Sequence, residues 1–191
     1  VSSPALSHDG RKLAFAVRAT DFAANKGVTA IYLEDLAARD AAPPVRFSPE
    51  GMNVNSPAFS PDGRTLYFLS AKSGSMQLWA QPVAGGEAVQ VSDYAVDVNA
   101  YKISPDGSRV VLSMDVFADC DALACSKKRL DDTAANKASG MVFDRAFIRH
   151  WDTWSDQRRS QLFAADFDAA GKLSAAPTLL SKGIDGDVPS K

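Results

Sequence analysis

The sequence predicts an all-β fold: a partial β-propeller of four-stranded antiparallel blades, interrupted by one helical insertion. Two observations predict it, a corner motif that recurs three times and an alternating apolar run after each corner. The corners read SHDG, SPDG and SPDG, and they begin at Ser7, Ser60 and Ser104. Their starts are 53 and 44 residues apart, which suits propeller blades of about 40 to 50 residues.

The second unit displays its four predicted strands most plainly. The segment SPAFS enters the corner, and RTLYFLS follows as a strand with Leu66 and Phe68 on one side and Tyr67 and Leu69 on the other. A Gly and Ser loop leads to the strand MQLWAQPV, and a Gly-Gly turn leads on to EAVQVS. Four strands joined in this way form a meander, which is the unit of a blade.

The other two units follow the same plan. In the first, the later strands are KLAFAV, AIYLEDL and PVRFS, with RATDFAANKG as the loop between the first two of these. In the third, they are RVVLSM, QLFAADF and APTLLS. Asp and Gly of each corner are expected to serve the turn, and His8, in the slot that proline fills elsewhere, is expected to be a turn residue.

An insertion over residues 116–159 interrupts the third unit between its second and third strands. Its central part predicts a surface helix over Lys127–Ser139, with Ser126 as the N-cap and Gly140 at the C-terminus. Because strand direction alternates in a meander, the insertion is expected at the opposite end of the sheet from the Asp-Gly corners.

These assignments divide the chain into blades with the approximate limits 1–50, 51–99 and 100–182, the last with the insertion, and residues 183–191 start a further blade. Three blades do not close a ring, since propellers generally have four to eight. The chain is therefore expected to be part of a longer protein, or to associate with itself through its open edges.

Composition and motifs exclude several functions. The 21 basic and 23 acidic residues are scattered and give a net charge of -2, which does not suit a nucleic-acid partner. No apolar run approaches the roughly 20 residues of a membrane span. The sequence contains no G-x-S-x-G elbow, phosphate-binding loop or H-E-x-x-H motif, and DCD and DGD lack the donors of a calcium loop. No catalytic residue, metal or cofactor is therefore expected in this chain.

The segment RHWDTW is the most unusual in composition. It supplies the candidate substrate-binding residues Arg149, His150, Trp151, Asp152 and Trp154. In one interpretation, the arginine pairs with a substrate carboxylate and a tryptophan forms an apolar wall. In the other, the tryptophans wedge the inserted helix against the blade and the charged residues satisfy buried polar groups.

Two cysteines, Cys120 and Cys125, lie in the insertion with four residues between them. This spacing does not fit a zinc knuckle or a C-x-x-C redox pair. A short disulfide that pins a loop in an oxidising compartment and a pair of unlinked thiols both remain open.

The repeated corners, the LWAQPVAGGEAVQVS stretch and RHWDTWSDQRRSQLF together resemble the propeller of bacterial prolyl-oligopeptidase-family serine peptidases, of the dipeptidyl aminopeptidase and acylaminoacyl peptidase type. The resemblance implies a periplasmic or secreted protein. In it, the propeller gates and positions peptide substrates for a C-terminal α/β-hydrolase domain, which this chain lacks. The corners also occur in Tol-type periplasmic propellers, which imply a non-enzymatic scaffold for protein partners instead.

Overall fold

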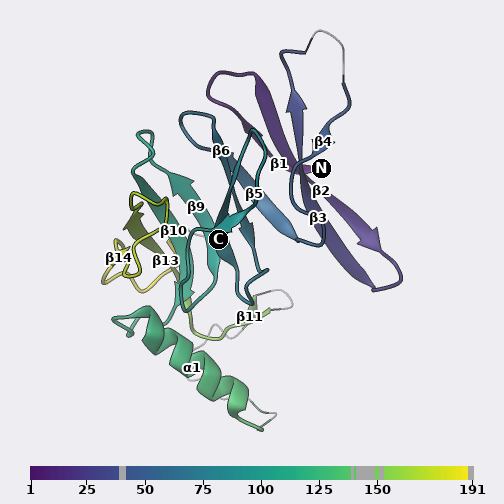
Figure 1. The fold of residues 1–191 in the computed structure, drawn as a ribbon. Helices are drawn as coiled ribbons and strands as arrows, with labels where there is room; N and C mark the ends of the chain where they lie inside the picture. The colour runs from purple at the N-terminus through teal and green to yellow at the C-terminus, as the bar shows by residue number, and fades with distance from the viewer. Residues whose placement is uncertain (39–41, 139, 141–148, 151–152, 189–191) are drawn as a thin grey trace.

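Three four-stranded antiparallel sheets, stacked in chain order as a fan, make up most of the computed structural model (Figure 1). The structure describes residues 1–38, 42–138, 140, 149–150 and 153–188. One helix, α1, lies beyond the end of the third sheet (Figure 1). The predicted fold class is thus confirmed. None of the described helices has the length and apolar character needed to cross a membrane.

Each sheet is a meander in which consecutive strands are neighbours. The first contains β1 (Ser2–Leu6), β2 (Lys12–Asp21), β3 (Lys26–Asp35) and β4 (Val45–Arg46). The second contains β5 (Val54–Phe59), β6 (Thr65–Ser70), β7 (Gln77–Pro82) and β8 (Val89–Gln90). The third contains β9 (Val98–Ile103), β10 (Arg109–Val116), β13 (Arg159–Asp166) and β14 (Thr178–Leu179). The predicted residue limits of the blades stay a prediction.

The three corners share one set of hydrogen bonds. In the second, the Ser60 hydroxyl donates to Asp62 Oδ1 at 2.6 Å, and Asp62 Oδ1 accepts from the Arg64 N–H at 3.0 Å. Gly63 has a φ of 69°, in the left-handed region that favours glycine. The first and third corners repeat the Ser-to-Asp bond at 2.7 and 2.5 Å. Asp and Gly therefore serve the turn, as predicted.

The second sheet is covered on both faces. Leu66 and Phe68 are fully buried in a cluster shared with the first sheet, while Leu69 belongs to a second cluster shared with the third sheet. Tyr67 packs against that second cluster, which confirms the predicted alternation along β6. The residues that form the two cores bury apolar surface between sheets, and this burial is the main force that holds the fan together.

The first hairpin differs from the prediction. The loop expected at RATDFAANKG shrinks to residues 22–25, because β2 and β3 pair without interruption as far as Asp21 and Lys26. Thr20 and Gly27, both within the expected loop, are partners in this ladder. Polar residues interrupt the apolar alternation in this segment, which is typical of a loop. An exposed hairpin end can nevertheless stay paired without that alternation.

The inserted helix is also shifted from its predicted place. Helix α1 spans Leu123–Ala135, with Ala122 as N-cap and Asn136 as C-cap. The predicted span from Lys127 was wrong, as was the N-cap role of Ser126: this residue lies buried inside the helix, and its hydroxyl accepts the Phe117 N–H at 3.1 Å. The helix also ends before Gly140, because Asn136 already turns to an extended conformation.

The insertion leaves the third sheet at the end expected from strand direction. Both β9 and β13 run antiparallel to β10, so the Ser104 corner and the insertion lie at opposite ends of β10. Within the insertion, β11 (Arg149–His150) pairs with β12 (Thr153–Trp154).

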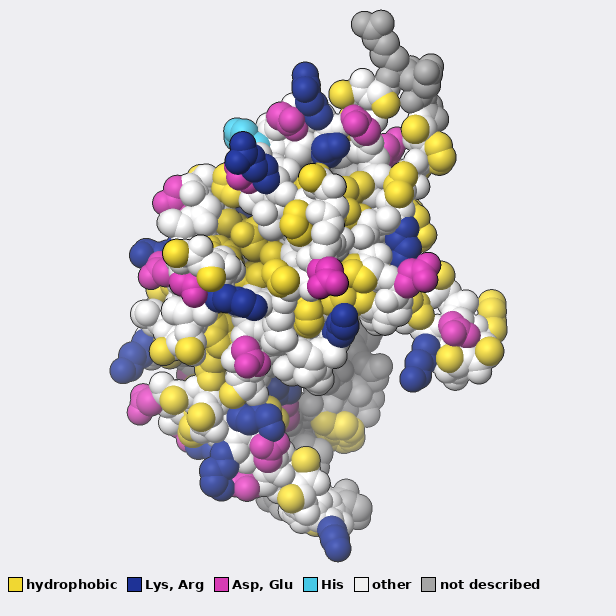
Figure 2. All heavy atoms as spheres, in the orientation of Figure 1, with side chains coloured by type: hydrophobic (Ala, Val, Ile, Leu, Met, Phe, Trp, Pro, Cys, Tyr) yellow, Lys and Arg dark blue, Asp and Glu magenta, His cyan; other side chains and the backbone are white. Residues whose placement is uncertain are grey.

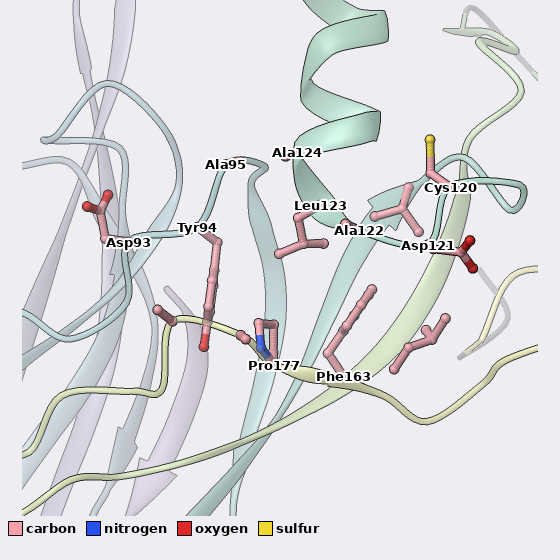
Figure 3. Close-up of a pocket in the computed structure, with 14 residues that line it drawn as sticks. Asp93, Tyr94, Ala95, Cys120, Asp121, Ala122, Leu123, Ala124, Phe163 and Pro177 are labelled. Atoms are coloured by element: carbon pink, nitrogen blue, oxygen red, sulfur yellow. The ribbon is translucent and has the colours of Figure 1, made fainter.

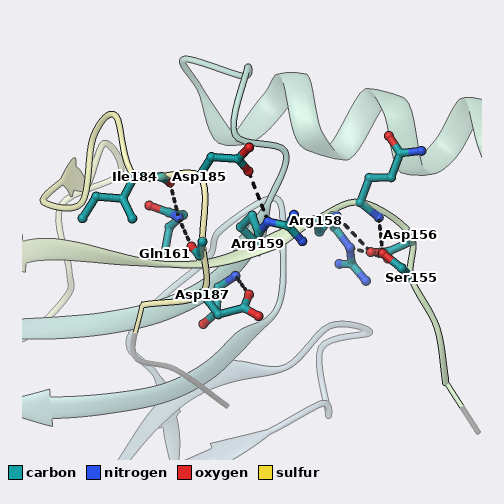
Figure 4. A network of polar contacts seen from close by, with 11 residues as sticks. Ser155, Asp156, Arg158, Arg159, Gln161, Ile184, Asp185 and Asp187 are labelled. Carbon is teal, nitrogen blue, oxygen red and sulfur yellow. Dashed lines mark hydrogen bonds and ion pairs between the residues drawn. The ribbon is translucent and has the colours of Figure 1, made fainter. Parts of the chain in front are cut away.

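Polar contacts of one kind close the connections that follow the second and third sheets. In the third sheet, Gln161 Nε2 donates to the Ile184 and Gly186 carbonyls at 3.2 and 2.8 Å, and its Oε1 accepts from the Ser181 hydroxyl (Figure 4). The Ser160 N–H donates to Asp187 Oδ1 at 2.8 Å (Figure 4). After the second sheet, the side chain of Gln77 contacts the Tyr94 carbonyl and the Ser92 hydroxyl in the same way, and Asp97 accepts the Met76 N–H. We call each of these two sets of contacts a linker latch.

The visible surface carries charges of both signs. Figure 2 shows Lys and Arg side chains interspersed with Asp and Glu side chains across this face, with apolar side chains between them. On this face the described charges of opposite sign therefore offset one another.

Candidate functional site

The insertion is anchored to the third sheet at its start. Cys120 and Cys125 are joined by a disulfide, with their Cα atoms 5.6 Å apart. This bridge ties the loop after β10 to the first turn of α1, and the Phe117 contact to Ser126 ties the same two segments a second time. Together these contacts fix where the helix leaves the sheet.

An arginine completes this anchor. Arg129 Nη1 and Nη2 donate to the two carboxylate oxygens of Asp119 at 2.8 and 2.6 Å. Its guanidinium carbon lies 4.9 Å from the centre of the Phe117 ring, a cation–π distance. The hydrogen bonds from Arg129 lower the pKa of Asp119, which favours the charged, paired form of this carboxylate.

Three of the candidate substrate-binding residues lie on described strands: Arg149 and His150 on β11, and Trp154 on β12. Arg149 is paired with Trp154 in its backbone register, so the structure places these two residues side by side. Trp154 is about half exposed, with 50% of its surface accessible. Trp151 and Asp152 lie outside the described residues, and a substrate-binding role for the segment stays a prediction.

A pocket of about 420 Å³ lies where α1 begins, and no sequence pattern marks it (Figure 3). Its larger apolar side chains come from the linker after β8, from β10, β13 and β14, and from the start of α1: Tyr94, Val116, Leu123, Phe163, Pro177 and Leu179. Five alanines line it as well, and their small side chains leave the space open. We call it the helix-start pocket.

The polar groups of the helix-start pocket are few. Asp93 and Asp121 stand at its two ends in Figure 3, and its lining includes no basic side chain among the described residues. The Tyr94 hydroxyl donates to the Ser174 carbonyl at 3.0 Å, and burial raises the pKa of Tyr94 to about 12. Tyr94 is therefore an uncharged part of the pocket wall. The charged side chains of the described lining, Asp93 and Asp121, are both negative.

A second hollow of about 290 Å³ adjoins the first. The two share Val116, Cys120, Asp121 and Leu179, so they form one continuous groove along β14. Strand β14 is the edge of the third sheet opposite β9, and the groove therefore lies away from the first strand of the sheet. Among the residues the structure describes, no group of three His, Cys, Asp or Glu side chains gathers as a metal site would.

This architecture of repeated four-stranded meanders with Asp-Gly corners is that of a β-propeller segment. A family model described as TolB beta propeller domain, named PD40, matches residues 1–175. The chain belongs to this family.

The curated relatives include peptidases. Dipeptidyl-peptidase 5 of Porphyromonas gingivalis is 30% identical over 156 residues, which is 81% of this chain and 21% of that protein. The same-named protein of Porphyromonas endodontalis is 26% identical over 78% of this chain and 20% of its own length. The chain thus spans about a fifth of these relatives, and it is a propeller portion of the kind found in peptidase-family proteins.

Solved structures support the same fold. An acylaminoacyl peptidase from Pyrococcus horikoshii superposes with a TM-score of 0.62 over 90% of this chain and 23% of that one, at 14% identity. A TolB structure from Agrobacterium tumefaciens gives 0.52 over 96% of this chain and 52% of that one, at 22% identity. At these identities the likeness concerns the fold alone.

Proposed function

We propose that this chain is the non-catalytic propeller segment of a periplasmic or secreted serine exopeptidase. In the longer protein it gates and positions peptide substrates for an α/β-hydrolase domain. The observation that carries the proposal is the 30% identity to dipeptidyl-peptidase 5 over most of the chain. The disulfide of the insertion supports an oxidising compartment.

A half-buried apolar residue on the third sheet and a repeated backbone contact support a further blade. Leu78 of the second sheet is fully buried towards the third, whereas Leu162, its counterpart in the shared Q-L-aromatic pattern, is only half-buried. Asp187 accepts a hydrogen bond from the Ser160 N–H, just as Asp97, directly before β9, accepts one from the Met76 N–H. We therefore propose that residues 183–191 begin a further blade, which would cover Leu162.

The insertion supplies the proposed substrate contacts. It leaves the sheet at the end opposite the Asp-Gly corners, and it carries the candidate substrate-binding residues Arg149, His150, Trp151, Asp152 and Trp154. A propeller end that faces a hydrolase domain is where such residues would meet the end of a peptide.

The test uses the longer protein that contains this chain, with residues 117–158 replaced by the short β6–β7 turn sequence, 71–76. Hydrolysis of a dipeptidyl substrate is expected to fall by about tenfold or more in kcat/KM, because peptide positioning is lost. Hydrolysis of a small activated ester should stay unchanged, since it needs no positioning by the propeller. A protein that reacts with no serine-hydrolase probe would overturn the proposal.

A Tol-type scaffold is the second candidate, and the family model and the Agrobacterium likeness favour it. It predicts a longer protein without a hydrolase domain, from which affinity purification recovers a stable envelope protein. The same purification from an active peptidase should recover none.

A further inference from the structure

We infer that the helix-start pocket and the hollow beside it form a docking groove for a polypeptide segment that carries an apolar side chain flanked by basic residues. The proposed function does not require this site. The groove lies along β14, at the edge of the sheet opposite β9. Its occupant is a separate polypeptide, and three features of the groove specify its chemistry.

The size and lining of the pocket specify an apolar side chain. A volume of about 420 Å³ lies within the range of ligand pockets, which is about 300 to 1,000 Å³. Phe163 and Tyr94 are 5% exposed each, so the walls are held in place by the core behind them. An apolar group that enters this space loses contact with water on most of its surface, which favours binding.

The charges at the pocket specify basic neighbours for that side chain. Asp93 and Asp121 are exposed, stand at opposite ends of the pocket, and have no ion pair among the described residues (Figure 3). Other exposed carboxylates nearby are engaged, as Asp119 is with Arg129. At the helix-start pocket, a ligand with cationic groups on both sides of its apolar group would therefore meet two carboxylates and no basic side chain of the described lining; Lys182 lines the adjoining hollow.

The shape of the groove and the start of α1 specify a polypeptide. The adjoining hollow extends the pocket towards Ile184, so the groove is longer than one compact ligand needs. Ala122 provides no side-chain cap, and no hydrogen bond is described for the N–H groups of Leu123 and Ala124 at the pocket. Carbonyl groups of a peptide backbone are suitable acceptors for these N–H groups.

The test measures binding of short peptides to the 191-residue chain by fluorescence anisotropy. A labelled peptide with lysine-leucine-lysine at its centre is compared with glutamate-leucine-glutamate and lysine-serine-lysine versions. The first is expected to bind most tightly, and salt should weaken it because exposed charges are screened. Equal binding of all three peptides would overturn the proposal, as would equal binding of a simple alkylamine, which would indicate a small-molecule pocket.

Variants locate the site. Asp93→Asn and Asp121→Asn should each weaken binding by about fivefold, the effect of an exposed ion pair of about 1 kcal/mol. Ala176→Phe fills the pocket and should abolish binding. Glu87→Gln, an exposed acid outside the groove, is the matched control and should have no effect. Affinity that is indifferent to all three groove variants would refute the assignment, and thermal melts identify any variant that fails to fold.

Discussion

The side-chain amide nitrogen of Gln77 lies 3.0 Å from the carbonyl oxygen of Tyr94 and donates a hydrogen bond to it. The same nitrogen donates to the Val96 carbonyl, while Oε1 accepts from the Ser92 hydroxyl and from the Tyr94 N–H. Gln77 is fully buried, so one side chain satisfies polar groups along the linker between the second and third sheets. The first sheet has Ala30 at this position, and alanine has no side-chain group that could make such a contact.

Replacement of this glutamine should therefore be costly. Gln77→Met keeps the volume but leaves several buried polar groups without partners, and we expect a loss of about 2 to 4 kcal/mol in unfolding free energy. Gln90→Met is the control, since Gln90 is only partly buried and its side chain donates a single described bond, to the Ser92 carbonyl. Urea unfolding of the three proteins measures both effects, and similar midpoints for the two variants would contradict the role of the latch.

The Asp-Gly corners should make stability depend on pH in the acidic range. The Ser104 hydroxyl, with further bonds from Ser108, lowers the pKa of Asp106 from 3.8 to about 2. Because the folded-state value is lowered, the stabilisation is complete above about pH 4 and is lost as the pH falls towards 2. Asp106→Asn should therefore melt below the wild type at pH 5, with a difference that shrinks by about pH 2.

Two measurements control this prediction. Carbon-detected NMR titration should find the Asp106 carboxylate still charged at a pH where exposed carboxylates have taken up protons. Glu87→Gln should change the melting temperature little at either pH, because no described contact involves its side chain. A constant difference between wild type and Asp106→Asn across the range would rule out the linkage.

Arg129 should hold the start of the inserted helix. Arg129→Gln removes the paired hydrogen bonds to Asp119 and the contact with the Phe117 ring. We expect the backbone amides of α1 to exchange about fivefold faster, as the loss of about 1 kcal/mol in local stability would produce. Lys128→Gln is the matched control, because it breaks only an exposed pair with Asp132 within the helix. Equal exchange in the two variants would count against the anchor.

The disulfide predicts the thiol content of the protein. Titration of the unfolded, unreduced chain should detect no free thiol, and two thiols would refute the bridge. Changing both Cys120 and Cys125 to alanine should cost about 2 kcal/mol, as expected for a bridge that closes a short loop. The loss should appear as faster proteolysis within residues 117–138, with the sheets unaffected until higher temperature. Reduction of the wild type should reproduce it.

The sequence predicts most of this fold because its corners are made by local chemistry. Ser60, Asp62 and Gly63 form their turn within six residues, so the same phrase produces the same turn wherever it occurs. The alternation of Leu66 to Leu69 likewise depends only on strand geometry. Both features are visible without knowledge of the rest of the chain.

What the sequence fails to predict depends on distant contacts. Ser126 is of a residue type that favours N-caps, but the Phe117 N–H engages its hydroxyl from outside the helix. The helix-start pocket draws on segments as far apart as Asp93 and Leu179, with no local pattern to mark it. The Q-L-aromatic pattern repeats at Gln77 and Gln161 and is a sequence signal for the linker latches. Its role becomes visible only when the positions of the two linkers are known.

The ladder between β10 and β13 continues through eight consecutive residue pairs, from Arg109 with Asp166 to Val116 with Arg159. Residues 117–158 thus leave and re-enter the sheet side by side and without a change of register. A hairpin end of this kind tolerates an inserted segment of almost any length, since the entropic cost of closing a loop grows only slowly with its size. For protein engineering, this position is a graft site, where a foreign domain with adjacent termini can replace the helix while the sheet keeps its strands.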